Sequence, residues 1–201
     1  MIQDGYTAVE TGKIASIVTY LEMHTAPLGP PVPDDPRWVL RRRMVPDLDW
    51  YRRLFRAVGE EWLWFSRLGM SDEELRSVIH DESVDVFALE VGGTEKGILE
   101  LDRRGAGEIE IAFLGVTPDL IGQGAGRFLL ARAIELAWSH RPHRVMLHTC
   151  TLDHPRALEF YRRAGFVPYK REVEVAPDPR LAGILPMTAA KHCPVLSQPR
   201  Q

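Results

Sequence analysis

The sequence feature that most restricts the fold of this chain is a glycine-rich stretch placed directly before a long apolar segment. Gly122, Gly124 and Gly126 alternate with other residues, and residues 124–138 carry apolar side chains at helical spacing. Glycine adopts positive φ without steric cost, and a helix N-terminus presents unpaired N–H groups with a partial positive charge. The stretch is therefore either a binding loop for a phosphate or pyrophosphate or a structural turn, and by itself it leaves both open.

Two common nucleotide-binding motifs do not fit this stretch. A dinucleotide fingerprint that begins at Gly122 needs glycine or alanine at position 127, where the chain has Arg127. A P-loop needs a lysine followed by a hydroxyl residue, and the segment GAGRFL has neither. A nucleotide-dependent oxidoreductase, which would bind NAD(P), is therefore a less favoured interpretation.

Hydrophobic periodicity and turn residues predict a mixed α/β sheet. The expected strands cover residues 12–24, 86–91, 97–102, 108–116, 143–150 and 166–175. The expected helices cover residues 47–58, 71–80, 124–138 and 154–165. The three consecutive strands before the glycine stretch predict an antiparallel meander, and the elements after it predict a β-α-β-α-β order.

Local signals fix several boundaries of these elements. Asp47 is a candidate N-cap for a helix that Gly59 ends, and Ser71 with Glu74 forms a capping box for the next helix. The proline-rich residues 26–36 predict a rigid connection, and the basic run at 41–43 is interpreted as a solvated face.

Charge and cysteine content exclude some classes of protein. The 201 residues carry a net charge of −3, so no overall positive field would attract nucleic acid. No run of about 18 apolar residues predicts a membrane span, and the N-terminus lacks the pattern of a signal peptide. Cys150 and Cys193 form neither a disulfide framework nor a metal-ligand spacing, so we expect a cytoplasmic protein without a metal.

Two motifs resemble those of the GNAT superfamily of N-acetyltransferases. Its acetyl-CoA-binding motif [RQ]-x-x-G-x-[GA] falls on Ile121, Gly122, Gln123, Gly124, Ala125 and Gly126, and Ile121 departs from it. Its later motif N-x-x-A-x-x-x-Y-x-x-x-G-F falls on the segment from His154, which replaces the asparagine, through Ala157 and Tyr161 to Phe166. Residues 51–67 and 148–158 look like a bacterial subgroup of unknown substrate.

The resemblance implies a fold and an activity. We expect a single GNAT-like domain over residues 1–176 with splayed central strands, followed by a tail, 177–201, that is partly packed or loose. The implied reaction moves an acetyl group from acetyl-CoA directly to a primary amine of a small molecule or peptide. Neither nucleic acid nor membrane is an expected partner, and a homodimer is expected by analogy. The alternative is a non-catalytic acyl-CoA-binding or sensor domain.

The resemblance also implies roles for individual residues. Tyr161 would be the general acid for the departing thiolate, and Glu110 would be the base, with Glu108 or a water chain as alternatives. The residues expected to contact the cofactor are Leu114, Val116, Ile121, Gly122, Gln123, Gly124, Ala125, Gly126, His154 and Ala157. Strict alternation along residues 108–116 would put Glu110 on the same face as Leu114 and Val116.

Other side chains have two interpretations each. The aromatic and basic residues within and after the first predicted helix either form the acceptor wall or pack the helix; they are Trp50, Arg52, Trp62, Trp64 and Arg67. Cys150 is either an acyl-enzyme nucleophile or a buried small residue, and Asp153 is expected to cap the following helix, with Pro155 in its first turn. His148 is expected to be structural or to face the substrate.

Overall fold

A seven-stranded mixed sheet in the order β2-β3-β4-β5-β6-β1-β7 organises the chain. The structure is a computed structural model that describes residues 4–28, 33 and 35–197. The strands are β1 (Lys13–Met23), β2 (Trp38–Arg43), β3 (Val84–Val91), β4 (Thr94–Asp102), β5 (Glu108–Val116), β6 (Arg144–Cys150) and β7 (Val167–Pro177). The helices are α1 (Leu48–Gly59), α2 (Asp72–Ile79), α3 (Ala125–Ser139) and α4 (Ala157–Arg163), with short 3-10 turns η1 (Glu60–Trp62) and η2 (Pro118–Leu120).

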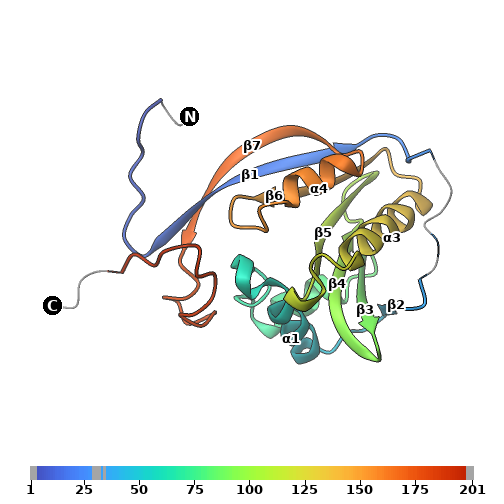
Figure 1. The fold of residues 1–201 in the computed structure, drawn as a ribbon, viewed down its shortest axis with the longest axis horizontal. Helices are drawn as coiled ribbons and strands as arrows, with labels where there is room; N and C mark the ends of the chain where they lie inside the picture. The colour runs from blue at the N-terminus through green and yellow to red at the C-terminus, as the bar shows by residue number, and fades with distance from the viewer. Residues whose placement is uncertain (1–3, 29–32, 34, 198–201) are drawn as a thin grey trace.

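The mixed α/β fold class is confirmed, and β3, β4 and β5 form the expected antiparallel meander. Asp47 caps α1 by accepting a hydrogen bond from the backbone N–H of Trp50, and Ser71 with Glu74 forms the capping box of α2. β1 pairs antiparallel with both β6 and β7, and β1 and β7 form a long ribbon that extends past the other strands (Figure 1).

The strand β2 was not predicted; within it, only residues 41–43 were interpreted, as a solvated basic run. The basic run at 41–43 does lie at the surface, with Arg41 and Arg42 exposed and Arg43 half-buried. Each arginine also binds a carboxylate: Arg41 binds Glu90 at 2.6 Å, and the other two bind carboxylates of β3 and β4. The pairs of Arg41 and Arg42 join β2 to β3 at the edge of the sheet, and the pair of Arg43 reaches β4. Part of the expected connection, residues 29–32 and 34, lies outside the described residues.

Two apolar layers cover the faces of the sheet. α3 packs on one face against side chains that include Leu114 and Leu147, while α1 and α2 pack on the other against Val86 and Ile98. α3 and α1 accordingly lie on different sides of β4 and β5 (Figure 1).

Alternation along β5 breaks at one residue. Glu100 of β4 pairs with Phe113, but Leu101 pairs with Ile111, so Ala112 forms a bulge. Ile111 and Leu114 therefore both pack on the α3 side, and Phe113 packs on the α1 side. The prediction that Leu114 and Val116 share a face with Glu110 was wrong, because the bulge moves every later side chain to the opposite face.

Residues after β7 pack against the beginning of the ribbon. Leu185, Ala189 and Ala190 are buried against Ile14 of β1 and Leu63. The side chains of Asp178 and Arg180 are almost fully buried and bind each other at 2.8 Å. Arg180 also donates hydrogen bonds to the carbonyls of Ala189 and Cys193, at 3.1 and 2.7 Å. One ion pair thus holds the turns of this segment together.

We expect Arg180→Ala to lower the free energy of unfolding by about 3 kcal/mol, because it leaves the buried Asp178 carboxylate without a counter-ion. Urea unfolding measures this loss. Arg163→Ala, which removes an exposed pair with Glu159, is the control and should have a much smaller effect. Equal losses for the two variants would contradict the anchoring role of Arg180.

Candidate active site

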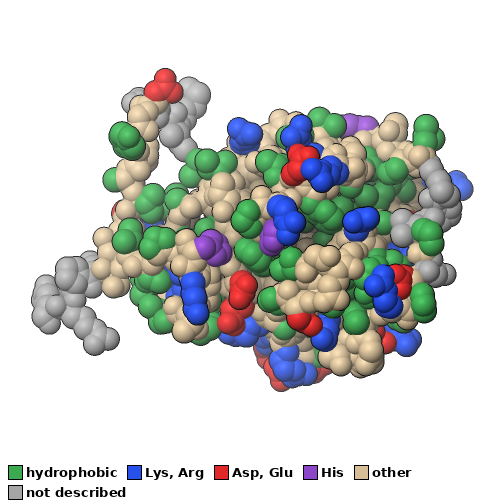
Figure 2. Space-filling model, in the orientation of Figure 1, with side chains coloured by type: hydrophobic (Ala, Val, Ile, Leu, Met, Phe, Trp, Pro, Cys, Tyr) green, Lys and Arg blue, Asp and Glu red, His purple; other side chains and the backbone are tan. Residues whose placement is uncertain are grey.

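A groove of about 1500 Å³ opens where β5 and β6 separate. The pairing of the two strands ends at Glu110 and Met146, and in the described part of the chain no strand continues along that edge of β5. The area between α3 and α4 carries mixed hydrophobic and basic side chains (Figure 2). Of the sequence-predicted site residues, those that line the groove are Glu110, Leu114, Val116, Ile121, Gly122, Gly124, Gly126, His154, Ala157 and Tyr161.

The glycine stretch delivers the N-terminus of α3 to this groove. Gly124 is the N-cap with φ of +94°, and it offers no side chain to cap the helix. A Cβ at Gly124 would lie 3.1 Å from the ring of Trp38, so both conformation and space require glycine there. The first amides of α3 are therefore uncapped beside the groove, which is the geometry that binds an anion.

Two residues of the predicted binding motif do not line the groove. Gln123 donates its side-chain amide to the carbonyl of Asp119 at 2.6 Å, and Ala125 is fully buried in the core. Their side chains serve the local structure, and only their backbone could contact a ligand.

Tyr161 packs inside the groove wall. Its ring lies 5.3 Å from that of Phe160 and 6.5 Å from that of Phe166, measured between centroids. Burial raises the pKa of the phenol well above its ordinary value, and the carboxylate of Asp153 raises it further. The hydroxyl therefore keeps its proton at neutral pH.

The two candidate bases have different surroundings. Glu108 lies in an ion-pair cluster, where Arg144 binds it at 2.7 Å and Glu22 at 2.8 Å. Glu110 faces the groove and is 3.0 Å from Nδ1 of His148, which also lines the groove. The hydrogen bond with Glu110 raises the pKa of His148.

Trp64 spans the gap between the separated strands. Its indole packs on Phe113 of β5 at 5.3 Å, and a side chain at Gly115 would meet it. Its Nε1 donates to Asp153, beyond the end of β6, at 3.0 Å. Asp153 also accepts hydrogen bonds from Thr149 and from the backbone of Cys150. The expected role of Asp153 as a helix cap was wrong, because α4 begins later, at Ala157, without a side-chain cap.

The predicted acceptor wall divides into two groups. Trp62, Trp64 and Arg67 line the groove. Trp50 instead donates to Glu95 at 2.5 Å, and Arg52 binds Asp72 at 2.6 Å, away from the groove.

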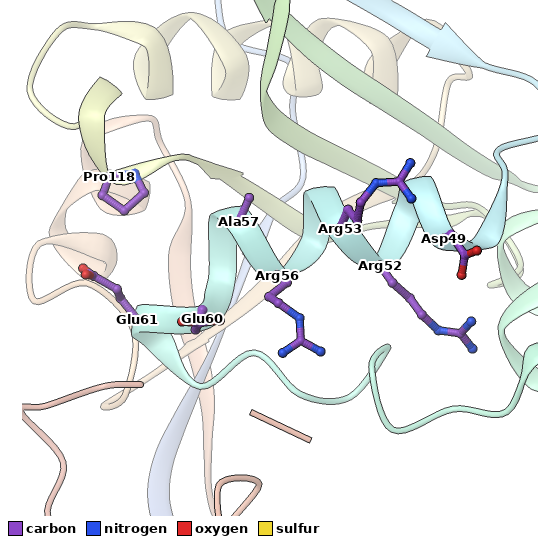
Figure 3. A pocket seen from close by; sticks show the side chains of 8 residues that line it. All are labelled: Asp49, Arg52, Arg53, Arg56, Ala57, Glu60, Glu61 and Pro118. Atoms are coloured by element: carbon purple, nitrogen blue, oxygen red, sulfur yellow. The ribbon is translucent and has the colours of Figure 1, made fainter. Parts of the chain in front are cut away.

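Arg52 lies at a second, smaller cavity on the outer face of α1, with a volume of about 590 Å³. There Arg53 points to the opposite side of the helix from Arg52 and Arg56 (Figure 3). The three guanidinium groups therefore do not converge on one ligand position.

The geometry does not support a cysteine nucleophile. Burial, followed by the charge of Asp153, raises the pKa of the Cys150 thiol, which disfavours the thiolate. His154 accepts a hydrogen bond from the backbone of Arg156 at 3.1 Å, and no Cys150–His154 hydrogen bond joins them in the described residues.

Sequence reasoning missed a buried cluster next to the groove. Glu100 is fully buried, accepts a hydrogen bond from the hydroxyl of Tyr51, and binds Arg67 at 2.6 Å. The guanidinium of Arg67 also lies 5.0 Å from the ring of Phe113. The only signal in the sequence was a glutamate within the apolar strand GILELD, and this pattern does not indicate which residues bind the glutamate.

Within the described ranges, no group of three or more His, Cys, Asp or Glu side chains is arranged to hold a metal ion. No helix among the described residues is long and apolar enough to cross a membrane.

The acetyltransferase (GNAT) family model matches residues 48–166 of the chain. No curated protein matches the chain. Among solved structures, a GCN5-related N-acetyltransferase from Sphaerobacter thermophilus is similar, with 20% identity and a TM-score of 0.61 over 87% of this chain and 54% of that one. A putative GNAT acetyltransferase from Novosphingobium aromaticivorans has 16% identity and a TM-score of 0.55, over 84% and 68%.

A chimeric spermidine N-acetyltransferase from Vibrio cholerae has 22% identity and a TM-score of 0.54, over 67% of this chain and 82% of that one. Similarity to solved structures at this level of sequence identity shows a shared fold alone. The chain spans less than two thirds of the length of some structures that it matches, including 63% of a conserved Staphylococcus epidermidis protein.

We expect Trp64→Phe to lower the free energy of unfolding by about 2 kcal/mol, because it removes a hydrogen bond to a carboxylate while keeping an aromatic ring. Thermal or urea unfolding measures the change. The matched control is Trp62→Phe, since the indole N–H of Trp62 makes no hydrogen bond in the described part of the chain. A Trp64→Phe variant as stable as the control would mean that the bond to Asp153 does not hold the groove.

Proposed function

We propose that this chain, which belongs to the GNAT family of acetyltransferases, is an acyltransferase that moves an acetyl group from acetyl-CoA directly to a primary amine of a small molecule or peptide. The proposal rests on one observation: three features that the reaction needs border the same groove. An uncapped helix N-terminus, the unpaired edge of β5 and the hydroxyl-bearing ring of Tyr161 all border it.

The N-terminus of α3 fits the pyrophosphate of acetyl-CoA. Gly122, Gly124 and Gly126 border the groove without side chains that would obstruct a ligand, and the uncapped amides favour negative charge. Ile121 would contribute an apolar contact in place of the family's Arg or Gln, and Gln123 and Ala125 would contribute backbone alone. His154 and Ala157 border the same groove from the α4 side.

The edge of β5 fits the pantetheine arm. Since β6 leaves β5 after Glu110, the backbone groups toward Leu114 and Val116 are not used by a neighbouring strand on that side. Buried or half-buried backbone groups need hydrogen-bond partners, and the amides of the arm and the thioester oxygen would supply them.

Transfer then requires one proton donor and one acceptor. The amine nitrogen attacks the thioester carbonyl, the C–S bond breaks, and Tyr161 donates its proton to the departing thiolate. The raised pKa of Tyr161 means that the phenol carries its proton before the step. The proton of the amine leaves toward the pair formed by Glu110, the sequence-predicted base, and His148.

We propose further that the chain works in the cytoplasm, with an amine acceptor as its partner and neither nucleic acid nor membrane. Residues 1–176 as one catalytic domain, and a homodimer, stay predictions from the family resemblance. A release assay for CoA tests the activity across spermidine, kanamycin, amino acids and lysine peptides. Acetyl-CoA binding without CoA release from any of them would favour a sensor domain instead.

We expect Gly126→Asp to weaken acetyl-CoA binding about 100-fold, because a carboxylate in the first turn of α3 repels the pyrophosphate. Stability should not fall, since an acidic residue there suits the helix dipole and the nearest atom to a new Cβ, on Phe160, is 4.0 Å away. Calorimetric titration measures the affinity, and Gly126→Ala is the control. Unchanged affinity in Gly126→Asp would contradict the proposed pyrophosphate position.

We expect Tyr161→Phe to lower kcat by about tenfold or more, because the thiolate would leave without a proton donor. The affinity for acetyl-CoA should stay nearly unchanged, since only the hydroxyl is removed. Steady-state kinetics with the best acceptor from the screen measures both effects, and an unaltered kcat would remove Tyr161 from the mechanism.

A further inference from the structure

We propose that His148 is the group that takes the proton from the acceptor amine, and that Glu110 is a positioning residue that orients the imidazole of His148. The inference rests on the proposed function and reassigns the base within its groove.

The geometry of the pair supports this division of roles. Oε1 of Glu110 lies 3.0 Å from Nδ1 of His148, a hydrogen-bond distance. With Glu110 ionised, Nδ1 carries the hydrogen and donates it, so the lone pair of the neutral ring is on Nε2. Among the described residues no protein group hydrogen-bonds to Nε2. The nitrogen that can accept a proton is therefore the one not used by Glu110.

The orientation of the ring is fixed from a second side. Tyr20 of β1, which is paired with His148 across the sheet, packs its ring 5.6 Å from the imidazole. The side chain of His148 keeps 44% of its surface exposed and borders the groove. The imidazole is thus held in place while one edge stays accessible to a substrate and to solvent.

Charged groups around the ring favour its protonated form. Glu110 of β5 acts most strongly, and Asp153, after β6, and Glu174 of β7 add negative charge. Partial burial opposes them, but the net effect is a pKa raised above the usual value of about 6.5. An alkyl ammonium loses its proton near pH 10, as lysine does, so an imidazole of raised pKa is a better match for it than a carboxylate.

The protons balance as follows. Nε2 takes one proton from the substrate ammonium, and the neutral amine attacks the thioester carbonyl. Tyr161 gives its proton to the sulfur as the C–S bond breaks, and the second proton of the nitrogen replaces the one that Tyr161 lost. His148 then releases its proton to solvent, so one proton leaves for each amide formed.

The test compares His148→Gln with Glu110→Gln, using the amine that the wild-type enzyme acetylates fastest. We expect His148→Gln to lower kcat by about 100-fold with an unchanged dissociation constant for acetyl-CoA, and Glu110→Gln to lower it by about tenfold or less. The inference is overturned if Glu110→Gln loses as much kcat as His148→Gln, or more.

The pH dependence of kcat/KM separates a positioning role of Glu110 from a merely structural one. In the wild type, kcat/KM should rise with pH through the titration of His148, above pH 6.5. Glu110→Gln removes the main cause of the raised pKa, so this limb should move to lower pH. A limb that stays in place in Glu110→Gln contradicts the inference.

Histidine NMR titration checks the same pair without turnover. The His148 resonance should titrate above the usual value in the wild type and lower in Glu110→Gln, while the exposed His24 serves as the control resonance. If no amine in the screen releases CoA from the wild type, the proposed function fails. If CoA is released but the kinetic comparison is reversed, only the assignment of His148 fails.

Discussion

The site depends on the separation of β5 from β6 after three paired residues. The bulge at Ala112 turns Phe113 toward α1, and Gly115 leaves room for the indole of Trp64 against the strand. Trp64 then reaches across to Asp153, which is fixed by hydrogen bonds at the end of β6. The strands are thus held apart by packing and by one charged hydrogen bond, and the groove lies between them.

Several ionisable groups near the groove are already bound to a partner or buried. Glu108 is occupied by Arg144, and the fully buried Glu100 by Arg67. Cys150 is held as a thiol by burial. His148 borders the groove with Nδ1 bound to Glu110 and with no protein partner for Nε2 among the described residues, and the Tyr161 hydroxyl keeps its proton. The proposed reaction accordingly uses proton transfer at these two positions.

The sequence predicted the parts of this arrangement that depend on local patterns. The caps at Asp47 and Ser71, the meander and the glycine turn before α3 were predicted because each rests on neighbouring residues. β2 was missed because its alternation of apolar and polar residues is short, and because the carboxylates that bind its arginines lie on strands much later in the sequence. The bulge at Ala112 was missed because it depends on register with β4, and Glu100 because its partners lie far away in the sequence. Asp153 was assigned to the wrong element because the start of α4 depends on the chain packed around it.

The central claim is that an acyl-CoA lies between β5 and β6 with its pyrophosphate at the start of α3. Backbone amide hydrogen exchange, with and without acetyl-CoA, tests it most directly. The account predicts slower exchange in residues 111–116 and 122–127, with little change in α1 or β7. Protection confined to the outer cavity of α1, or no protection at all, would contradict it.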